Sequence, residues 1–189
     1  MNKVLLVLLS AVAAPLLGGE YSLQLTPENT QIEWTLTDVL HTVRGTFRLK
    51  QGSLRFESES GKAGGEVVVD VVSGGSGSGA RDKRMHRNIL ESALFPEAVF
   101  VPDRVDGRLA PSGASQVKVH GQLGLHGGHH DVTMDVRAKV VQGRVTADIS
   151  FDVPYVDWGL KDPSTLFLKV DKKVHVTMHV AAALKGLDS

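Results

Sequence analysis

The sequence predicts an all-β protein: a single antiparallel barrel of eight strands, with one short α-helix inserted after the fourth strand. Three observations lead to this fold class. Apolar and polar residues alternate in three consecutive runs between residues 117 and 153, which is the two-residue period of half-buried strands. Helical spacing of apolar residues occurs after a loop rich in glycine and serine. No strand-helix-strand repeat is visible, so a parallel sheet is not expected.

The 117–153 stretch is typical of a three-stranded meander with two tight turns. We place these turns at Gly127-Gly128 and Gln142-Gly143, because glycine adopts the backbone conformation that two-residue hairpin turns require. A slip of either strand by one residue would turn an apolar face outward. The apolar pairs that these turns predict are Val119 with Val136, Gly121 with Met134, Leu123 with Val132, Met134 with Phe151, and Val136 with Ile149.

Alternation in the first half predicts strands at 31–36, 43–49, 54–56 and 66–72, with a turn at 50–53 around Gly52. The flexible loop 73–79 follows, and apolar spacing then predicts a helix over 80–93 that Pro96 ends. Two glycines of this loop, Gly74 and Gly79, have the spacing of a phosphate-binding loop. Ala80 and Arg81 stand where that motif needs Lys and Ser or Thr, so we do not expect phosphate binding.

The remaining segments complete the barrel. A strand is predicted at 99–101, and two closing strands are predicted at 166–170 and 174–180. The connection 154–164 is long and contains Tyr155, Trp158 and two prolines. Long connections of this kind often carry function.

Residues 1–19 have the features of a secretory signal peptide: one early Lys3, an apolar run, and small residues before Glu20. We therefore expect that residues 20–189 form the mature domain and that this domain is periplasmic or secreted. A retained membrane anchor is the alternative, although the stretch is short for a spanning helix. The chain has no cysteine, so disulfides do not stabilise it. Its 21 basic and 21 acidic residues give no basic surface of the kind that nucleic-acid binding needs.

A set of short motifs is spread over residues 21–184. These are Trp34 with His41 and Gly45-x-Phe47, the glycine-serine loop followed by Arg81-Asp82, Phe95-Pro96 with Phe100, Gly121-x-Leu123-x-Leu125-His126-Gly127, and Trp158-Gly159-Leu160. Together they resemble the YceI-like family of exported lipid-binding proteins, with departures from the family pattern at 91–94 and 156–159. The resemblance implies a lipocalin-like barrel whose elongated apolar cavity holds a polyisoprenoid or a related long-chain amphiphile, without catalysis.

The expected ligand site is the inner face of the barrel, where each buried methylene would contribute roughly 0.8 kcal/mol. Small inward residues such as Gly45 and Gly121 would leave room for a ligand, although they would equally suit a filled core. Arg81 and Asp82 are candidates to orient the head group, with a solvated ion pair as the alternative. The expected site residues are Trp34, Leu36, Phe47, Arg81, Asp82, Phe100, Gly121, Leu123, Met134, Phe151, Trp158, Leu168 and Met178.

Two other functions remain open from the sequence. His126 and His129 flank the expected first turn and would face each other with β-carbons about 5 Å apart, so they are candidate ligands for Zn²⁺ or Cu²⁺. A hydrolase or isomerase is the second alternative, because barrels can host catalysis, although no nucleophile elbow or metalloprotease motif is present. Our prediction is a non-enzymatic carrier of a long-chain lipid or isoprenoid quinone-like ligand, without another cofactor. Transient membrane contact and a monomeric or dimeric state are compatible with it.

Overall fold

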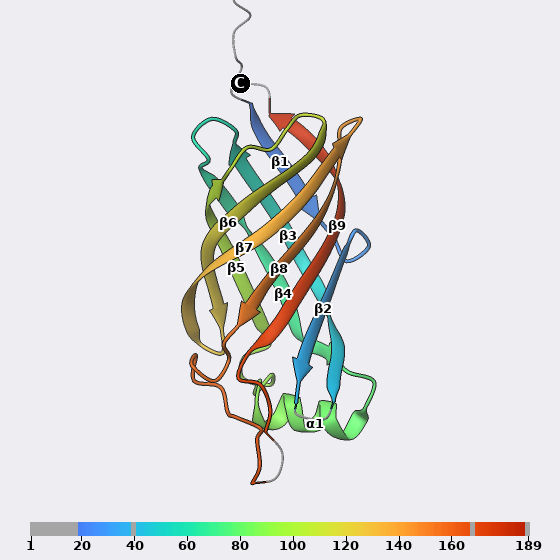
Figure 1. Cartoon of the computed structure of the whole chain (residues 1–189), viewed down its shortest axis with the longest axis vertical. Helices are drawn as coiled ribbons and strands as arrows, with labels where there is room; N and C mark the ends of the chain where they lie inside the picture. Colours follow the sequence, from blue (N-terminus) through green and yellow to red (C-terminus); the bar gives the residue numbers. More distant parts are fainter. Residues whose placement is uncertain (1–18, 39–40, 167–168, 188–189) are drawn as a thin grey trace, which may run out of the picture.

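The computed structural model describes residues 19–38, 41–166 and 169–187, which form a closed antiparallel barrel with a helix lying across one end (Figure 1). Its elements in chain order are β1 (Glu20–Leu25), β2 (Thr30–Thr37), β3 (Thr42–Glu57), β4 (Ala63–Gly75), α1 (Gly79–Asn88), β5 (Glu97–Asp106), β6 (Gly113–Leu125), β7 (Gly128–Val141), β8 (Arg144–Val153) and β9 (Val174–Leu187). The predicted leader, residues 1–19, lies outside the described residues except for Gly19. In the described part of the chain, no helix is both long and apolar enough to cross a membrane.

The nine described strands make an eight-stranded barrel because β1 and β2 share one position in the wall. The second half of β3 and the end of β9 pair with β1, whereas the first half of β3 and the start of β9 pair with β2. Pairing of β3 with β4 completes the circle, and each of these strand pairs is antiparallel. The predicted fold class is therefore confirmed, although the sequence reading missed β1.

The turn predicted around Gly52 is wrong. β3 runs unbroken for 16 residues, with register shifts between Thr46 and Arg48 and between Leu49 and Gln51. Such bulges bend a strand, and this bend lets β3 follow the curved wall past two successive partners. Gly52 lies in the middle of the strand, opposite Leu25 on one side and Val67 on the other.

The first turn of the meander lies one residue earlier than predicted. His126 and Gly127 occupy it with φ values of 52° and 78°, as a primed two-residue turn requires. Gly121 consequently pairs with Val132 rather than Met134, a shift of two residues that leaves every side chain on its predicted face. The shift also sets Lys118 opposite Asp135, with 2.6 Å between Nζ and Oδ1. The second turn, at Gln142-Gly143, is as predicted.

Two further elements differ from the prediction. α1 ends at Asn88 rather than at residue 93, and the chain then reverses around Glu91, whose φ is 43°. The His86 ring fixes this reversal, because its nitrogens lie 2.7 Å from the Gly74 carbonyl oxygen and 3.0 Å from Ser92 Oγ. In the described part of 166–170 there is no strand; Val170 makes one isolated bridge to Asp38, and residues 167–168 lie outside the description. The described residues of the connection between β8 and β9 instead lie at the end of the barrel (Figure 1).

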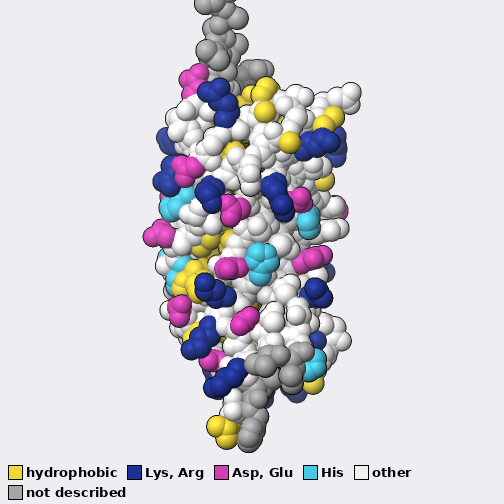
Figure 2. Space-filling view, in the orientation of Figure 1, with side chains coloured by type: hydrophobic (Ala, Val, Ile, Leu, Met, Phe, Trp, Pro, Cys, Tyr) yellow, Lys and Arg dark blue, Asp and Glu magenta, His cyan; other side chains and the backbone are white. Residues whose placement is uncertain are grey.

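The inner face of the barrel forms one apolar core. On β7 the buried residues are Val132, Met134, Val136, Ala138 and Val140, and the residues between them are exposed. The outer wall carries interspersed acidic, basic and histidine side chains (Figure 2). Two of its pairs join β8 to β9: Asp148 Oδ1 lies 2.5 Å from His179 Nδ1, and Asp152 Oδ1 lies 2.8 Å from His175 Nδ1.

Gly121 provides a test of the register between β5 and β6, in which it lies opposite Pro102. A β-carbon there would meet the Val101 carbonyl oxygen and would lie 2.7 Å from Pro102 Cα and 2.8 Å from Phe100 Cζ. We expect Gly121→Ala to lower the free energy of unfolding by about 1–3 kcal/mol, because the close-packed wall has no space for the methyl group. Denaturant unfolding measures the change. Gly124→Ala is the control, since its β-carbon would come no nearer than 3.5 Å to a neighbour; equal stability of the two variants would contradict the register.

Candidate ligand-binding cavity

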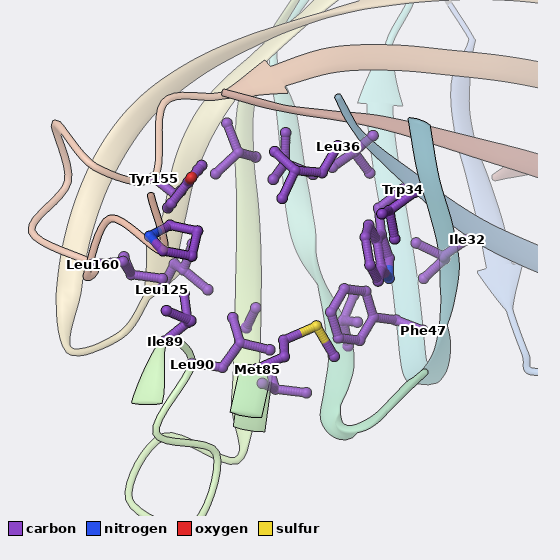
Figure 3. Close-up of a pocket in the computed structure, with 18 of the residues that line it drawn as sticks. Ile32, Trp34, Leu36, Phe47, Met85, Ile89, Leu90, Leu125, Tyr155 and Leu160 are labelled. Atoms are coloured by element: carbon purple, nitrogen blue, oxygen red, sulfur yellow. The ribbon is translucent and has the colours of Figure 1, made fainter. Parts of the chain in front are cut away.

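A cavity of about 420 Å³ lies inside the barrel at the end that α1 covers (Figure 3). Inward-facing side chains of the strands form its wall, and it is covered by α1 and by residues of the connection between β8 and β9, among them Tyr155, Leu160 and Pro163. Its volume falls within the range of roughly 300–1,000 Å³ that is usual for small-molecule sites. The lining is almost entirely apolar, as the strand alternation requires.

The wall is built around the indole ring of Trp34. Trp34 lies opposite Gly45 in the β2–β3 pair, and a β-carbon on Gly45 would collide with the ring, so glycine at this position is what lets the indole lie flat against the wall. The Phe47 ring packs beside it, with 6.4 Å between ring centroids. The buried Nε1 of Trp34 has no hydrogen-bond partner in the described structure. An acceptor on a bound molecule is one way for such a donor to be satisfied.

The cover of the cavity has two parts. Met85 on α1 faces the cavity, with Ile89 and Leu90 just after it, and Tyr155 and Leu160 face it beside Ile89 (Figure 3). The Tyr155 hydroxyl donates a hydrogen bond to the Asp171 carbonyl oxygen at 2.8 Å and so ties the two ends of the connection together. Burial, with the nearby Asp162 and Asp171, raises the pKa of Tyr155 to about 12. The phenol therefore stays neutral over the physiological pH range.

Trp158 anchors the connection from outside the cavity. Its ring stacks on the His130 ring of β7, with 4.0 Å between centroids and an interplanar angle of 4°. Burial, with a contribution from His129, lowers the pKa of His130. The neutral imidazole is therefore favoured, as suits a ring packed against an indole.

The charged side chains at the cavity are Asp38, Arg81 and Arg84 among the described lining residues. Arg81 donates to the Ser76 hydroxyl at 2.7 Å and to the Ser76 carbonyl oxygen at 3.2 Å. Asp82 accepts hydrogen bonds from the Ser76 N–H and hydroxyl, so it fixes the glycine-serine loop instead of facing the cavity. Both charged residues of the predicted Arg-Asp pair thus hold this loop, and of the two only Arg81 reaches the cavity.

A second, smaller cavity of about 130 Å³ lies deeper in the barrel. The two cavities are separated by side chains that are neighbours across the sheet. Ile32, which lines the first cavity, pairs with Met178, which lines the second. Leu123 of the first cavity likewise pairs with Phe100 of the second. The interior is thus divided by a layer of apolar side chains. Methionine is the most adaptable part of that layer, because its side chain is unbranched.

The predicted site residues divide into four groups. The first cavity is lined by Trp34, Leu36, Phe47, Arg81, Leu123 and Phe151. The second is lined by Phe100, Met134 and Met178. Neither cavity is lined by Asp82, Gly121 or Trp158, and Leu168 lies outside the described residues. The interpretation of Gly121 as a space-making residue of a cavity is not what the structure shows, because Val101 and Pro102 of β5 approach it closely.

Sequence reasoning did not assign Met85, Ile89 or Leu90 to the site. Their helical spacing was visible, but an apolar face that packs on a filled core has the same pattern as one that covers a cavity. From the sequence, Tyr155 could line the cavity or its mouth or serve as a core or loop anchor, and in the structure it lines the cavity.

The two candidate metal ligands are not opposed. His126 lies in the turn, with its Nε2 2.8 Å from Glu91 Oε2 and its ring against Phe95, whereas His129 lies opposite Gly124. The expectation that they face each other is therefore wrong, because the turn begins one residue earlier. No group of three or more His, Asp or Glu side chains suited to a metal ion occurs within residues 19–38, 41–166 and 169–187.

Comparisons with known proteins agree with this architecture. The structure is similar to BcnA of Burkholderia cenocepacia (TM-score 0.66, 15% identity, 82% of this chain and 96% of that chain covered). It is also similar to a polyisoprenoid-binding domain from Saccharophagus degradans implicated in plant cell wall breakdown (TM-score 0.62, 16% identity, 87% of this chain and 98% of that chain covered). A third similar structure is the YCEI protein of Campylobacter jejuni (TM-score 0.61, 13% identity, 79% of this chain and 88% of that chain covered). A comparison with curated proteins found no match. Residues 23–182 match the model of the YceI-like domain, so the chain belongs to the YceI-like family.

Proposed function

We propose that this protein is a carrier that holds a polyisoprenoid or a similar long-chain amphiphile in the 420 Å³ cavity and performs no chemistry on it. The observation that carries the proposal is the cavity itself: an apolar space whose charged lining residues are Asp38 and two arginines of α1, within the described part of the chain. Burying six methylenes would contribute about 5 kcal/mol, which is comparable to the lower estimates of the cost of association. One similar structure is that of a polyisoprenoid-binding domain, which supports the ligand class.

The lining also suggests how the ligand is oriented. The tail would lie against Trp34, Phe47 and Phe151, and the head would lie near Arg81 and Arg84. Guanidinium groups donate hydrogen bonds and accept none, so they suit a head group with oxygen acceptors, such as a quinone carbonyl, a carboxylate or a phosphate.

A role without catalysis fits the state of the polar groups at the cavity. Tyr155 is held as a neutral phenol that donates to a backbone carbonyl, and Arg81 is bonded to the glycine-serine loop. None of these groups is a base paired with a nucleophile. We further propose, from the composition of residues 1–19, that the carrier acts in the periplasm or outside the cell, as a monomer or dimer.

Filling the cavity tests the proposal. Val176 lines the cavity, and its neighbour His175 lies half-exposed on the outer wall, so the same new side chain can be placed on either face. We expect Val176→Phe to reduce the amount of bound lipid at least about tenfold, since the ring occupies ligand space, while His175→Phe retains the lipid. Native mass spectrometry followed by lipid extraction measures the loading. Wild-type protein that carries no lipid when purified from its native host would refute the carrier function.

The dividing layer predicts a limit on chain length. For a series of prenyl alcohols, we expect affinity to rise with each added unit until the first cavity is full, and then to level off at Met178. Met178→Ala should move this limit to longer chains by joining the two cavities, although losing the side chain should lower stability by roughly 2–5 kcal/mol. Competition against a fluorescent lipid gives the affinities.

Val145→Ala is the matched control, because Val145 lines the second cavity from the start of β8 and does not pair with Ile32. If both variants show the wild-type limit, the layer does not set the chain length.

A further inference from the structure

Helix α1 concentrates positive charge at the cavity end of the barrel. Its exposed cations are Arg81, Lys83, Arg84 and Arg87. Its single acidic residue, Asp82, is only half-exposed and is bonded to Ser76. Together with the connection, residues 79–96 and 154–173 contain eight Lys or Arg and five Asp or Glu, in a chain whose totals are equal at 21 each. These two segments therefore carry a net positive charge, although the chain as a whole has a formal net charge of zero.

The same end displays two exposed leucines. Leu94, between α1 and β5, is 72% exposed, and Leu166, in the connection between β8 and β9, is 83% exposed; these are the most exposed large hydrophobic residues in the described part of the chain. The backbone of Leu94 is fixed by its N–H, which donates to the Glu91 carbonyl oxygen at 2.8 Å. The described part of the connection extends past α1 at this end of the molecule (Figure 1), where Figure 2 shows an exposed hydrophobic side chain, with basic side chains farther up.

Cations and exposed apolar side chains at the same end of a protein are the composition of a surface that binds anionic lipid bilayers. The cations would lie at the level of the phosphates, and the leucines would enter the boundary of the acyl chains. Arg81, Arg84 and Met85 also line the cavity, so a molecule docked in this way has its ligand site against the bilayer.

We propose that the α1 end docks transiently on an anionic phospholipid bilayer, which lets the lipid ligand pass between membrane and barrel without crossing water. The passage of ligand rests on the carrier function proposed above, whereas the docking itself can be measured independently of it.

The test uses the full chain and vesicles of phosphatidylcholine with or without phosphatidylglycerol, with partitioning measured by co-sedimentation. Each cation near an anionic surface strengthens binding by about fivefold. Lys83 and Arg87 do not line the cavity. We therefore expect the double variant Lys83→Gln, Arg87→Gln to lose about 25-fold in partitioning to phosphatidylglycerol vesicles while keeping its lipid load. The apolar stretch before Glu20 is the same in every variant, so differences report on the barrel end.

The matched control is Lys139→Gln, Arg144→Gln, which removes the same charge from exposed residues next to the β7–β8 turn at the other end of the barrel. It should partition like the wild type. Leu94→Ser, Leu166→Ser should weaken binding to the same vesicles with the positive charge intact.

Equal losses in the two charge variants would overturn the proposal, because binding would then follow total charge and not the α1 end. Equal partitioning of the wild type to both kinds of vesicle would also overturn it. A wild-type protein that docks as expected but carries no lipid would refute the carrier function and leave the docking surface standing.

Discussion

The closure of the sheet by β3 is the constraint on which the rest of the molecule depends. This strand is the common partner of β1, β2 and β4, and the last strand, β9, also pairs with β1 and β2, so the circle of strands closes. Closure removes the edges that an open sheet would expose, and it gives the alternating side chains one inside and one outside. The larger apolar cavity lies at one end of this inside, between the inner faces of the strands and the residues of α1 that cover them.

The sequence predicted which face each strand buries better than it predicted the pairing of the strands. Alternation distinguishes odd from even positions, so a shift of two residues, as at Gly121, leaves the pattern satisfied. The predicted register would set Lys118 opposite Arg137, and this pair of like charges was a signal against it. The observed register sets Lys118 opposite Asp135. Gly52 misled the prediction for a related reason: glycine marks both turns and close approaches within a strand.

The candidate site was predictable only as far as it is built from strands. Trp34, Phe47 and Phe151 face inward by alternation and do line the cavity. The division of the interior could not be read from the pattern, because Met178 and Val176 occupy equivalent inward positions, and only their depth in the folded barrel separates them. The part of the cover that follows α1 could not be predicted either. The hydrogen bonds of His86 at the end of α1 involve residues 6 and 12 positions away in the chain, which helical spacing does not reveal.

The shared position of β1 and β2 means that the barrel wall is divided at the same level as its interior. Leu23 and Leu25 of β1 line the inner cavity, whereas Ile32, Trp34 and Leu36 of β2 line the outer one. The break between the two strands is held by Asn29, whose Oδ1 accepts a hydrogen bond from the Thr26 N–H at 2.8 Å and whose Nδ2 donates to the Gln24 carbonyl oxygen at 3.0 Å. We expect β1 and β2 to belong to separate units of local unfolding. The ligand end can therefore open by local unfolding, with faster amide exchange in β2 than in β1, while the packed end keeps the barrel closed.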